Sequence, residues 1–237
     1  MTDPRSGGGP EPAPEVLECT LDELVDRAWA LAISGERHLL GLTGAPGAGK
    51  STVADQLVTR LGPGTAVLVA MDGFHLAGTV LERLGRSDRK GAPDTFDDAG
   101  YAALLRRLHD ADPTETVYAP DFRRGISEPI GSAIAVPPEI PLVITEGNYL
   151  LLDTGAWPRA HALLDAVWYL APGDDLRRER LVRRHETFGK SPQQARDWAL
   201  GSDERNAELI AATARRADLL IRLVCPLIPA IGDRGSR

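Results

Sequence analysis

The sequence has few cysteines and no long apolar run. Its two cysteines, Cys19 and Cys225, form no Cys-x-x-Cys pair and lie near no cluster of histidines in the sequence, so we expect reduced structural thiols and no metal or redox centre. No apolar run reaches the roughly 18 residues that a membrane-spanning helix needs, and the N-terminal segment lacks the apolar centre of a signal peptide. We therefore expect a cytoplasmic protein without membrane association.

An excess of positive charge is also absent. The chain of 237 residues carries a formal net charge of -7, which argues against a nucleic-acid partner because nucleic acids select basic surfaces. Hydrophobic residues make up 43% of the chain, which is enough for a substantial core. The length suits one domain, which we place at 16–226, between a disordered Gly- and Pro-rich tail at 1–15 and a loose tail at 227–237.

Short apolar runs alternate with amphipathic segments along the chain. Thr20 and Glu23 have the spacing of a capping box at the start of a helix, and Gly62 is typical of a helix end. We expect strands at 38–43, 65–70, 141–147, 165–171 and 217–224, and helices at 20–35, 51–62 and 97–111. This alternation predicts an α/β fold with a mostly parallel sheet covered by helices on both faces. The segment 113–138 predicts a hairpin or excursion beside the sheet.

The segment "GAPGAGKS" at 44–51 matches the pattern G-x-x-x-x-G-K-[ST] of a phosphate-binding loop. Its glycines let the backbone bend so that several N–H groups face one anion, and the helix that follows adds its positive dipole end. We expect Lys50 to reach the β- and γ-phosphates of ATP and the Ser51 hydroxyl to bind Mg²⁺. The expected nucleotide-binding residues are Gly44, Ala45, Pro46, Gly47, Ala48, Gly49, Lys50, Ser51 and Thr52.

The loop by itself does not identify the reaction. GTPases carry an Asn-Lys-x-Asp motif that reads the base, and the sequence has no Asn-Lys pair. It also has no signature of the LSGGQ type that marks ABC ATPases. Kinases and assorted NTPases remain.

Two carboxylates follow expected strands. Asp72 comes just after the strand at 65–70, and ligands of open parallel sheets bind at the carboxyl ends of strands, so Asp72 should share a sheet edge with the phosphate loop. There it can accept the proton of an alcohol that attacks the γ-phosphate. Glu146 ends another strand and is expected to hold Mg²⁺ through water. The alternatives are that Asp72 is only a helix-capping or turn residue and that Glu146 ends its strand by chance.

Several motifs together resemble one family. "GLTGAPGAGKST", "MDGFH", "RKGAPDTFD", "VITEGNYLLL" and "RRERLVRRH" are similar to the phosphoribulokinase/uridine kinase/pantothenate kinase family of P-loop kinases, over residues 37–223. The stretch "YAPDFRRGISEPIGSAIAV" resembles the subgroup described as fructose-transport-associated or nucleoside/nucleotide kinase-like. Uridine kinases usually carry Asp-Ser-Phe-Tyr where this chain has Asp-Gly-Phe-His. The resemblance implies a P-loop NTPase fold with a helical lid, near 174–192, and a small acceptor-side excursion.

The resemblance also implies roles for individual residues. Asp72 matches the catalytic base and Glu146 the acid on the Mg²⁺ side. The remaining matches are a substrate-side segment (Arg89, Lys90 and Gly91), a residue lining the acceptor pocket (Tyr118), lid arginines that close over ATP (Arg183 and Arg184) and a polar residue near the acceptor (Asn206).

Other candidate residues follow from their position in the sequence. Arg177, Arg180 and Arg184 share one helical face, which is either a solvated surface or part of a lid that neutralises phosphoryl charge. We list Arg123 as an acceptor contact, although Arg123 and Arg124 could equally be surface charges. His75 is expected to line the pocket, with proton transfer as the alternative, and Trp198 belongs either to the core or to the pocket.

The sequence thus predicts an ATP- and Mg²⁺-dependent kinase that phosphorylates a hydroxyl of a small metabolite. A sugar or a pantothenate-like acceptor is favoured, and a nucleoside acceptor is the first alternative. A non-catalytic ATP-binding regulatory module is the alternative of another class. The only partner expected is the small-molecule acceptor, and a homo-oligomer is possible.

Overall fold

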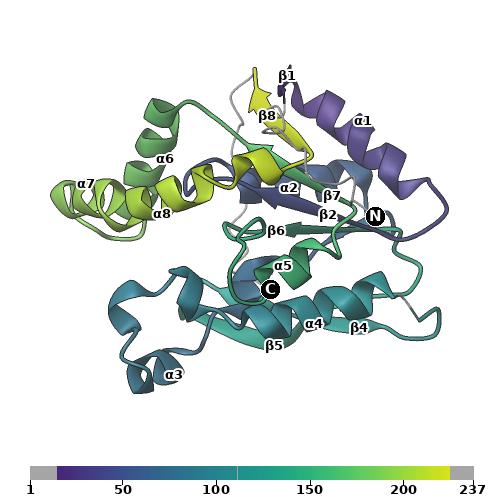
Figure 1. The fold of residues 1–237 in the computed structure, drawn as a ribbon, viewed down its shortest axis with the longest axis horizontal. Coiled ribbons are helices and arrows are strands. Elements are labelled where there is room, and N and C mark those ends of the chain that lie inside the picture. Colours follow the sequence, from purple (N-terminus) through teal and green to yellow (C-terminus); the bar gives the residue numbers. More distant parts are fainter. Residues whose placement is uncertain (1–14, 111, 225–237) are drawn as a thin grey trace, which may run out of the picture.

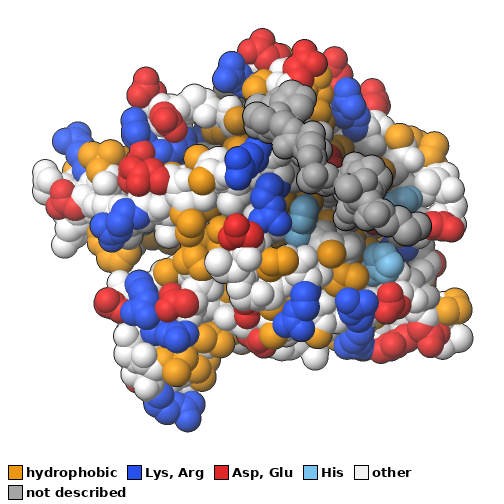
Figure 2. Space-filling view, viewed as in Figure 1, with side chains coloured by type: hydrophobic (Ala, Val, Ile, Leu, Met, Phe, Trp, Pro, Cys, Tyr) orange, Lys and Arg blue, Asp and Glu red, His pale blue; other side chains and the backbone are white. Residues whose placement is uncertain are grey.

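Residues 15–110 and 112–224 are described by a computed structural model of the chain. The expected tails at 1–15 and 227–237 lie outside these residues apart from Glu15, and so does Cys225. Within the described ranges no helix is long and apolar enough to cross a membrane. Among the described residues on the face drawn in Figure 2, Lys and Arg are interspersed with Asp and Glu, and no broad basic surface is visible.

The centre of the molecule is a six-stranded sheet with the order β1-β8-β7-β2-β6-β3, in which every pairing is parallel (Figure 1). The strands are β1 Val16–Cys19, β2 His38–Thr43, β3 Ala66–Leu68, β6 Leu142–Glu146, β7 Ala166–Leu170 and β8 Leu219–Leu223. The predicted strands are therefore confirmed. Strand β3 is shorter than predicted, because after Val69 the chain leaves the sheet and forms the 3₁₀ helix η1 Met71–Phe74. The edge strand β1 was not predicted.

Helices cover both faces of this sheet. Helices α1 Leu21–Ala32 and α2 Lys50–Leu61 pack on one face, while α4 Asp98–His109 and α5 Trp157–His161 pack on the other (Figure 1). A hydrophobic core lies on each face of the sheet, and strand β2 contributes side chains to both. Leu40 and Leu42 point to the α1–α2 side, and Leu39 points to the α4–α5 side. The capping box of Thr20 and Glu23 is present at the start of α1.

The predicted excursion is an antiparallel hairpin of β4 Val117–Arg123 and β5 Glu128–Val136. Its register shifts between Ala119 and Asp121, which marks a bulge. Three short elements lie between η1 and α4 in the chain: α3 Gly78–Arg83, η2 Ser87–Arg89 and η3 Pro93–Thr95. The hairpin lies on the same side of the sheet as α4 (Figure 1).

The predicted basic helix is α6 Asp174–Thr187, and it is followed by α7 Pro192–Leu200, α8 Ser202–Ala211 and η4 Ala214–Arg216. Figure 1 shows α6, α7 and α8 together at one end of the sheet. The predicted lid at 174–192 covers only α6 and the first residue of α7. Ion pairs of Arg177 with Glu204 and of His185 with Asp203 join α6 to α8, so these two helices are held as a unit.

Candidate active site

The phosphate loop lies between β2 and α2 with the backbone shape that its glycines permit. Gly49 precedes α2 in a left-handed conformation with φ 97°, and no side chain caps the helix, so its first N–H groups are left for an anion. At Gly47 φ is 82°, and a Cβ atom there would lie 2.5 Å from the backbone oxygen of Arg177. Glycine is required at this position because α6 lies directly against the loop.

Lys50 is the first residue of α2 and is almost fully buried, with 8% of its surface exposed. Its Nζ atom donates to the backbone oxygens of Gly44 at 2.8 Å and Ala45 at 3.2 Å. Burial lowers the pKa of Lys50 to about 8, and the negative charge of Glu146 partly opposes this shift. The ammonium group is therefore folded back along the loop, where a phosphate would meet it.

The two residues predicted to hold Mg²⁺ are in direct contact. The Ser51 hydroxyl donates to Oε1 of Glu146 at 2.8 Å, although the residues come from different elements, α2 and β6. Glu146 is buried, and burial followed by the charge of Asp72 raises its pKa, while Lys50 lowers it.

These oxygen donors fit Mg²⁺, which keeps several water molecules and is commonly bound through one or two protein ligands plus substrate phosphates. No group of three or more His, Cys, Asp or Glu residues within 15–110 and 112–224 has the arrangement of a metal site. A bound Mg²⁺ would thus need phosphate oxygens and water to complete its ligands.

Asp72 lies in η1, the 3₁₀ helix that follows β3 in the chain. Its carboxylate caps no helix, because Ala70 is the N-cap of η1 and no side-chain bond is made there. The side chain is 37% exposed. Gly73 packs against the hairpin, and a Cβ atom there would lie 2.5 Å from the backbone oxygen of Pro120. Asp72 is therefore a turn residue by conformation, but its carboxylate remains available to a ligand.

Lys50, Ser51, Asp72 and Glu146 line one cavity of 610 Å³, which we call the carboxylate cavity. Elements η2, β4, α6, α7 and α8 supply most of its other walls. A second cavity of 620 Å³, the α6 cavity, lies between the phosphate loop and α6. The residues that line both cavities are Lys50, Ser51, Arg124, Arg184 and Phe188, so the two cavities adjoin at the phosphate loop.

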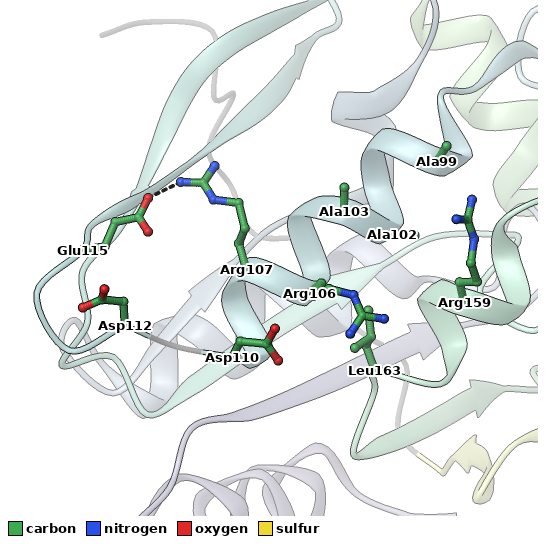
Figure 3. Close-up of a pocket in the computed structure, with 10 residues that line it drawn as sticks. All are labelled: Ala99, Ala102, Ala103, Arg106, Arg107, Asp110, Asp112, Glu115, Arg159 and Leu163. Carbon is green, nitrogen blue, oxygen red and sulfur yellow. Dashed lines mark hydrogen bonds and ion pairs between the residues drawn. The ribbon is translucent and has the colours of Figure 1, made fainter.

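A third hollow of 430 Å³ lies along α4 and α5 (Figure 3). Ala99, Ala102 and Ala103 line it, and Arg107 pairs with Glu115 at one end (Figure 3). No residue of the phosphate loop, η1 or α6 lines it. None of the predicted site residues lies in this groove, so it is not part of the same site.

Three arginines of α6, namely Arg177, Arg180 and Arg183, have different environments. Arg177 is 3% exposed and pairs with Glu204 at 2.7 Å, so it is not part of a solvated surface. Arg180 lies against the phosphate loop and donates to the backbone oxygen of Ala48 at 3.3 Å. Arg183 is 75% exposed, lines only the α6 cavity and pairs with Glu179 on its own helix.

Arg184 is the lid arginine that faces both cavities. It has no ion pair with any side chain inside the described ranges. Desolvation by the cavity walls lowers its pKa, and the charge of Asp203 opposes this shift. Of the two predicted lid arginines, Arg184 is thus the one placed beside Lys50, Asp72 and Glu146.

His75 lies in the carboxylate cavity beside Asp72. Its ring packs against Phe96 and Phe122, with centroid distances of 4.0 and 4.6 Å. Its Nδ1 atom lies 2.8 Å from the backbone oxygen of Asp72. Burial lowers the pKa of His75, which favours a neutral ring with Nδ1 as the donor. Such a ring is suited to lining a pocket and to accepting a hydrogen bond at Nε2.

Besides His75, four predicted acceptor-side residues line the carboxylate cavity, namely Arg89, Lys90, Gly91 and Asn206. Arg89 is tied to Asp94, with Nη2 2.8 Å from Oδ2. Lys90 donates to the backbone oxygen of Ser127 and lies 3.7 Å from Glu128. Asn206 reaches the cavity from α8.

Two predicted acceptor residues do not reach the cavity. Tyr118 is 55% exposed, and Arg123 is exposed beside Asp121; neither lines the carboxylate cavity. Tyr118 lies between the buried Val117 and Ala119, so the alternation of the strand turns it outward, while Arg123 follows the register shift between Ala119 and Asp121. The residues that do line the cavity from this segment are Phe122 and Arg124.

Further lining residues were missed or left open by sequence reasoning. His185 and Asp203 form an ion pair at 2.7 Å on the cavity wall, but they come from different helices, and no local pattern connects them. Trp198 lines the cavity and is 45% exposed, so its pocket alternative holds. Phe122 precedes the Arg123–Arg124 pair in the sequence, which was the one available signal.

A parallel sheet with a Gly-rich loop, a buried lysine and two carboxylates in one adjoining cavity defines the class of P-loop phosphotransferases. Comparison with known proteins agrees. A family model described as "Methylmalonyl Co-A mutase-associated GTPase MeaB" matches residues 18–75, which is the part of the chain from β1 through the phosphate loop to η1. This match covers about a quarter of the chain, including the phosphate loop.

Longer matches are to kinases. A Schizosaccharomyces pombe protein named "Putative uridine kinase" is 36% identical over 185 residues, which cover 75% of this chain and 77% of that protein. A Zygosaccharomyces rouxii protein named "ATP-dependent kinase" is 29% identical over 210 residues, covering 75% and 56%. The crystal structure of a "putative fructose transport system kinase" from Silicibacter has 37% identity and a TM-score of 0.76, with 85% of this chain and 98% of that chain covered.

The chain belongs to the phosphoribulokinase, uridine kinase and pantothenate kinase family of P-loop kinases. It is an ATP-dependent kinase, and hence a phosphotransferase.

Proposed function

We propose that the protein transfers the γ-phosphoryl group of ATP to a hydroxyl of a small metabolite bound in the carboxylate cavity, with a sugar or a pantothenate-like acceptor favoured. The observation that supports this most strongly is that Lys50 and Asp72 line the same cavity. They come from different strand ends, β2 with its loop and β3 with η1. A phosphate held by Lys50 and a hydroxyl held by Asp72 can then meet in line.

Each residue has a distinct task in this proposal. Lys50 and the loop N–H groups bind the β- and γ-phosphates, and Asp72 accepts the proton of the attacking hydroxyl as ADP leaves. Ser51 and Glu146 would hold Mg²⁺, which neutralises charge on the phosphates when bound. Arg184 stabilises negative charge on the transferred group, and α6 helps to exclude water from the site.

Two alternatives remain open to test. A nucleoside acceptor is supported by the name of the Schizosaccharomyces pombe relative. A non-catalytic ATP-binding module would keep the phosphate loop but would have no need of Asp72 and Glu146 facing the same cavity. That pair of carboxylates favours a catalyst.

The test is ADP release that depends on an acceptor, measured across pantothenate, uridine, fructose and related sugars. We expect release with at least one acceptor, formation of its phosphate ester in equal amount, and loss of both with Lys50→Ala. ADP release that ignores the acceptor, or normal turnover by Lys50→Ala, would contradict the proposal.

A further inference from the structure

We infer that the acceptor carries an anionic group, a carboxylate or a phosphate ester, which Lys90 and Arg124 bind beside Asp72. This inference rests on the proposed function and narrows its substrate class. It separates anionic acceptors from neutral sugars and nucleosides.

The carboxylate cavity is positively charged although the protein is acidic. Six cationic side chains and four acidic ones line it, whereas the whole chain has a net charge of -7. The cations are Lys50, Arg89, Lys90, Arg124, Arg184 and Arg205. Lys50, Arg124 and Arg184 also line the α6 cavity on the nucleotide side, but Arg89, Lys90 and Arg205 line only the carboxylate cavity. The positive charge therefore extends beyond the part that ATP would occupy.

The ion pairs of Lys90 and Arg124 are longer than that of Arg89. Arg89 pairs with Asp94 at 2.8 Å, and Asp203 contacts His185 at 2.7 Å. The nearest carboxylate to Arg124 is Asp72, at 4.0 Å, and Lys90 lies 3.7 Å from Glu128. Arg205 makes no ion pair with any residue in the described ranges. A neutral acceptor that displaced water here would leave Arg205 desolvated without a partner, and Lys90 and Arg124 with only these longer ion pairs.

Lys90 and Arg124 lie close to the expected position of the reacting hydroxyl. The Nζ atom of Lys90 is 5.7 Å from the ring centre of Phe122, which packs on His75. The charges of Lys90 and Arg124 both contribute to the lowered pKa of His75, so both lie near that ring. His75 itself bonds to the backbone of Asp72. An anionic group bound between Lys90 and Arg124 would hold a neighbouring hydroxyl near the Asp72 carboxylate.

The test compares matched acceptors that differ in one charged group: D-glycerate with glycerol, pantothenate with pantothenyl alcohol, and fructose 1-phosphate with fructose. The first two pairs probe a carboxylate and the third a phosphate. We expect the anionic member of at least one pair to have a kcat/KM at least about tenfold above its neutral partner, since a charge-assisted hydrogen bond is worth roughly ten- to a hundredfold.

Variants show whether Arg124 is the cause. Arg124→Gln should raise the KM for the anionic acceptor about tenfold or more relative to the change in KM for the neutral partner, whereas Arg124→Lys should restore most of the preference. Arg123→Gln is the matched control, because Arg123 is exposed outside the cavity. An equal loss of kcat for both members of a pair would assign Arg124 to the transferred phosphoryl group and overturn the inference.

A second arm needs no knowledge of the acceptor. A deproteinised cell extract is separated by anion exchange, and ADP release is measured with each fraction after subtraction of the Asp72→Asn background. We expect the acceptor activity in the retained, anionic fraction. Activity confined to the unretained fraction would overturn the inference but leave the proposed function standing. If neither fraction and none of the six compounds supports acceptor activity, both the inference and the proposed function are overturned.

Discussion

Replacing Glu204 with glutamine should destabilise the protein, because Glu204 joins α6 to α8. Its Oε2 atom lies 2.7 Å from Nη2 of Arg177, and its Oε1 atom lies 2.6 Å from Nη2 of Arg178. Arg177 is 3% exposed, and its other partners among residues 15–110 and 112–224 are Asp174 at 3.3 Å and the backbone oxygen of Pro46 at 3.5 Å. Removing the carboxylate charge would leave a buried guanidinium with weak partners.

The magnitude follows from the pKa of Glu204, which its two arginines lower from 4.5 to about 2. This lowering of the pKa corresponds to roughly 3.4 kcal/mol, because each pKa unit is worth about 1.36 kcal/mol. Because Arg178 is 39% exposed and Glu204 is 21% exposed, water screens part of this interaction energy. We expect the free energy of unfolding to fall by about 2 kcal/mol for Glu204→Gln at pH 7. For a domain of this size that is a fall in Tm of roughly 4–8 °C.

The pH dependence has a definite sign. A lowered carboxylate pKa contributes stability that is fully present above pH 4.5 and is lost as the pH falls towards 2. The difference between the native protein and Glu204→Gln should therefore be full at pH 7 and should shrink between pH 4.5 and 2.

Chemical denaturation at pH 7 and pH 3 measures both effects. The matched control is Glu179→Gln, which removes an exposed pair with Arg183 on the same helix and should cost less than about 0.5 kcal/mol. Equal stability of Glu204→Gln and the native protein at pH 7, or a difference that does not change with pH, would refute the reasoning.

Three further predictions concern the nucleotide. Because Lys50 has a pKa of about 8, kcat/KM for ATP should fall above pH 8. The value of kcat should depend less on pH, since bound phosphate holds the proton on Lys50. A pH–rate profile tests this, and an unchanged kcat/KM up to pH 10 would contradict it. Gly47→Ala should weaken ATP binding at least about tenfold in calorimetry, because the added Cβ atom would meet the backbone of Arg177. Gly131→Ala is the control and should not weaken ATP binding, because Gly131 has open space around it. Equal ATP affinities of the two variants would contradict the loop geometry. Ser51→Ala should raise the Mg²⁺ concentration for half-maximal activity about tenfold, and an unchanged Mg²⁺ dependence would exclude Ser51 as a ligand.

The sheet and the phosphate-binding end of the site could be predicted because their signals are local. The phosphate loop is a contiguous motif, and Asp72 and Glu146 each follow an apolar run that ends at the same edge of a parallel sheet. Strand β1 gave no such signal, since it has four residues and only Cys19 is buried. A short edge strand with one buried residue has too little apolar pattern to be recognised.

The acceptor end could not be predicted residue by residue, because tertiary packing decides it. The hairpin was expected, but not its register shift nor which of its side chains face the core, and Tyr118 and Arg123 lie outside the cavity whereas Arg124, in the turn after β4, lines it. The spacing of Arg177 along α6 is typical of a solvated helix face, yet Arg177 is buried and pairs with Glu204 of α8. A partner from a distant helix leaves no pattern in the local sequence.

The most direct test of the account is Asp72→Asn, studied with the best acceptor of the panel. We expect kcat to fall at least about a hundredfold, as for loss of a general base, while the Kd for ATP changes less than about twofold. Asp121→Asn, on the hairpin outside the cavity, should behave like the native protein. Full turnover by Asp72→Asn would contradict the central claim that Lys50 and Asp72 act on one phosphoryl transfer from opposite ends of a shared cavity.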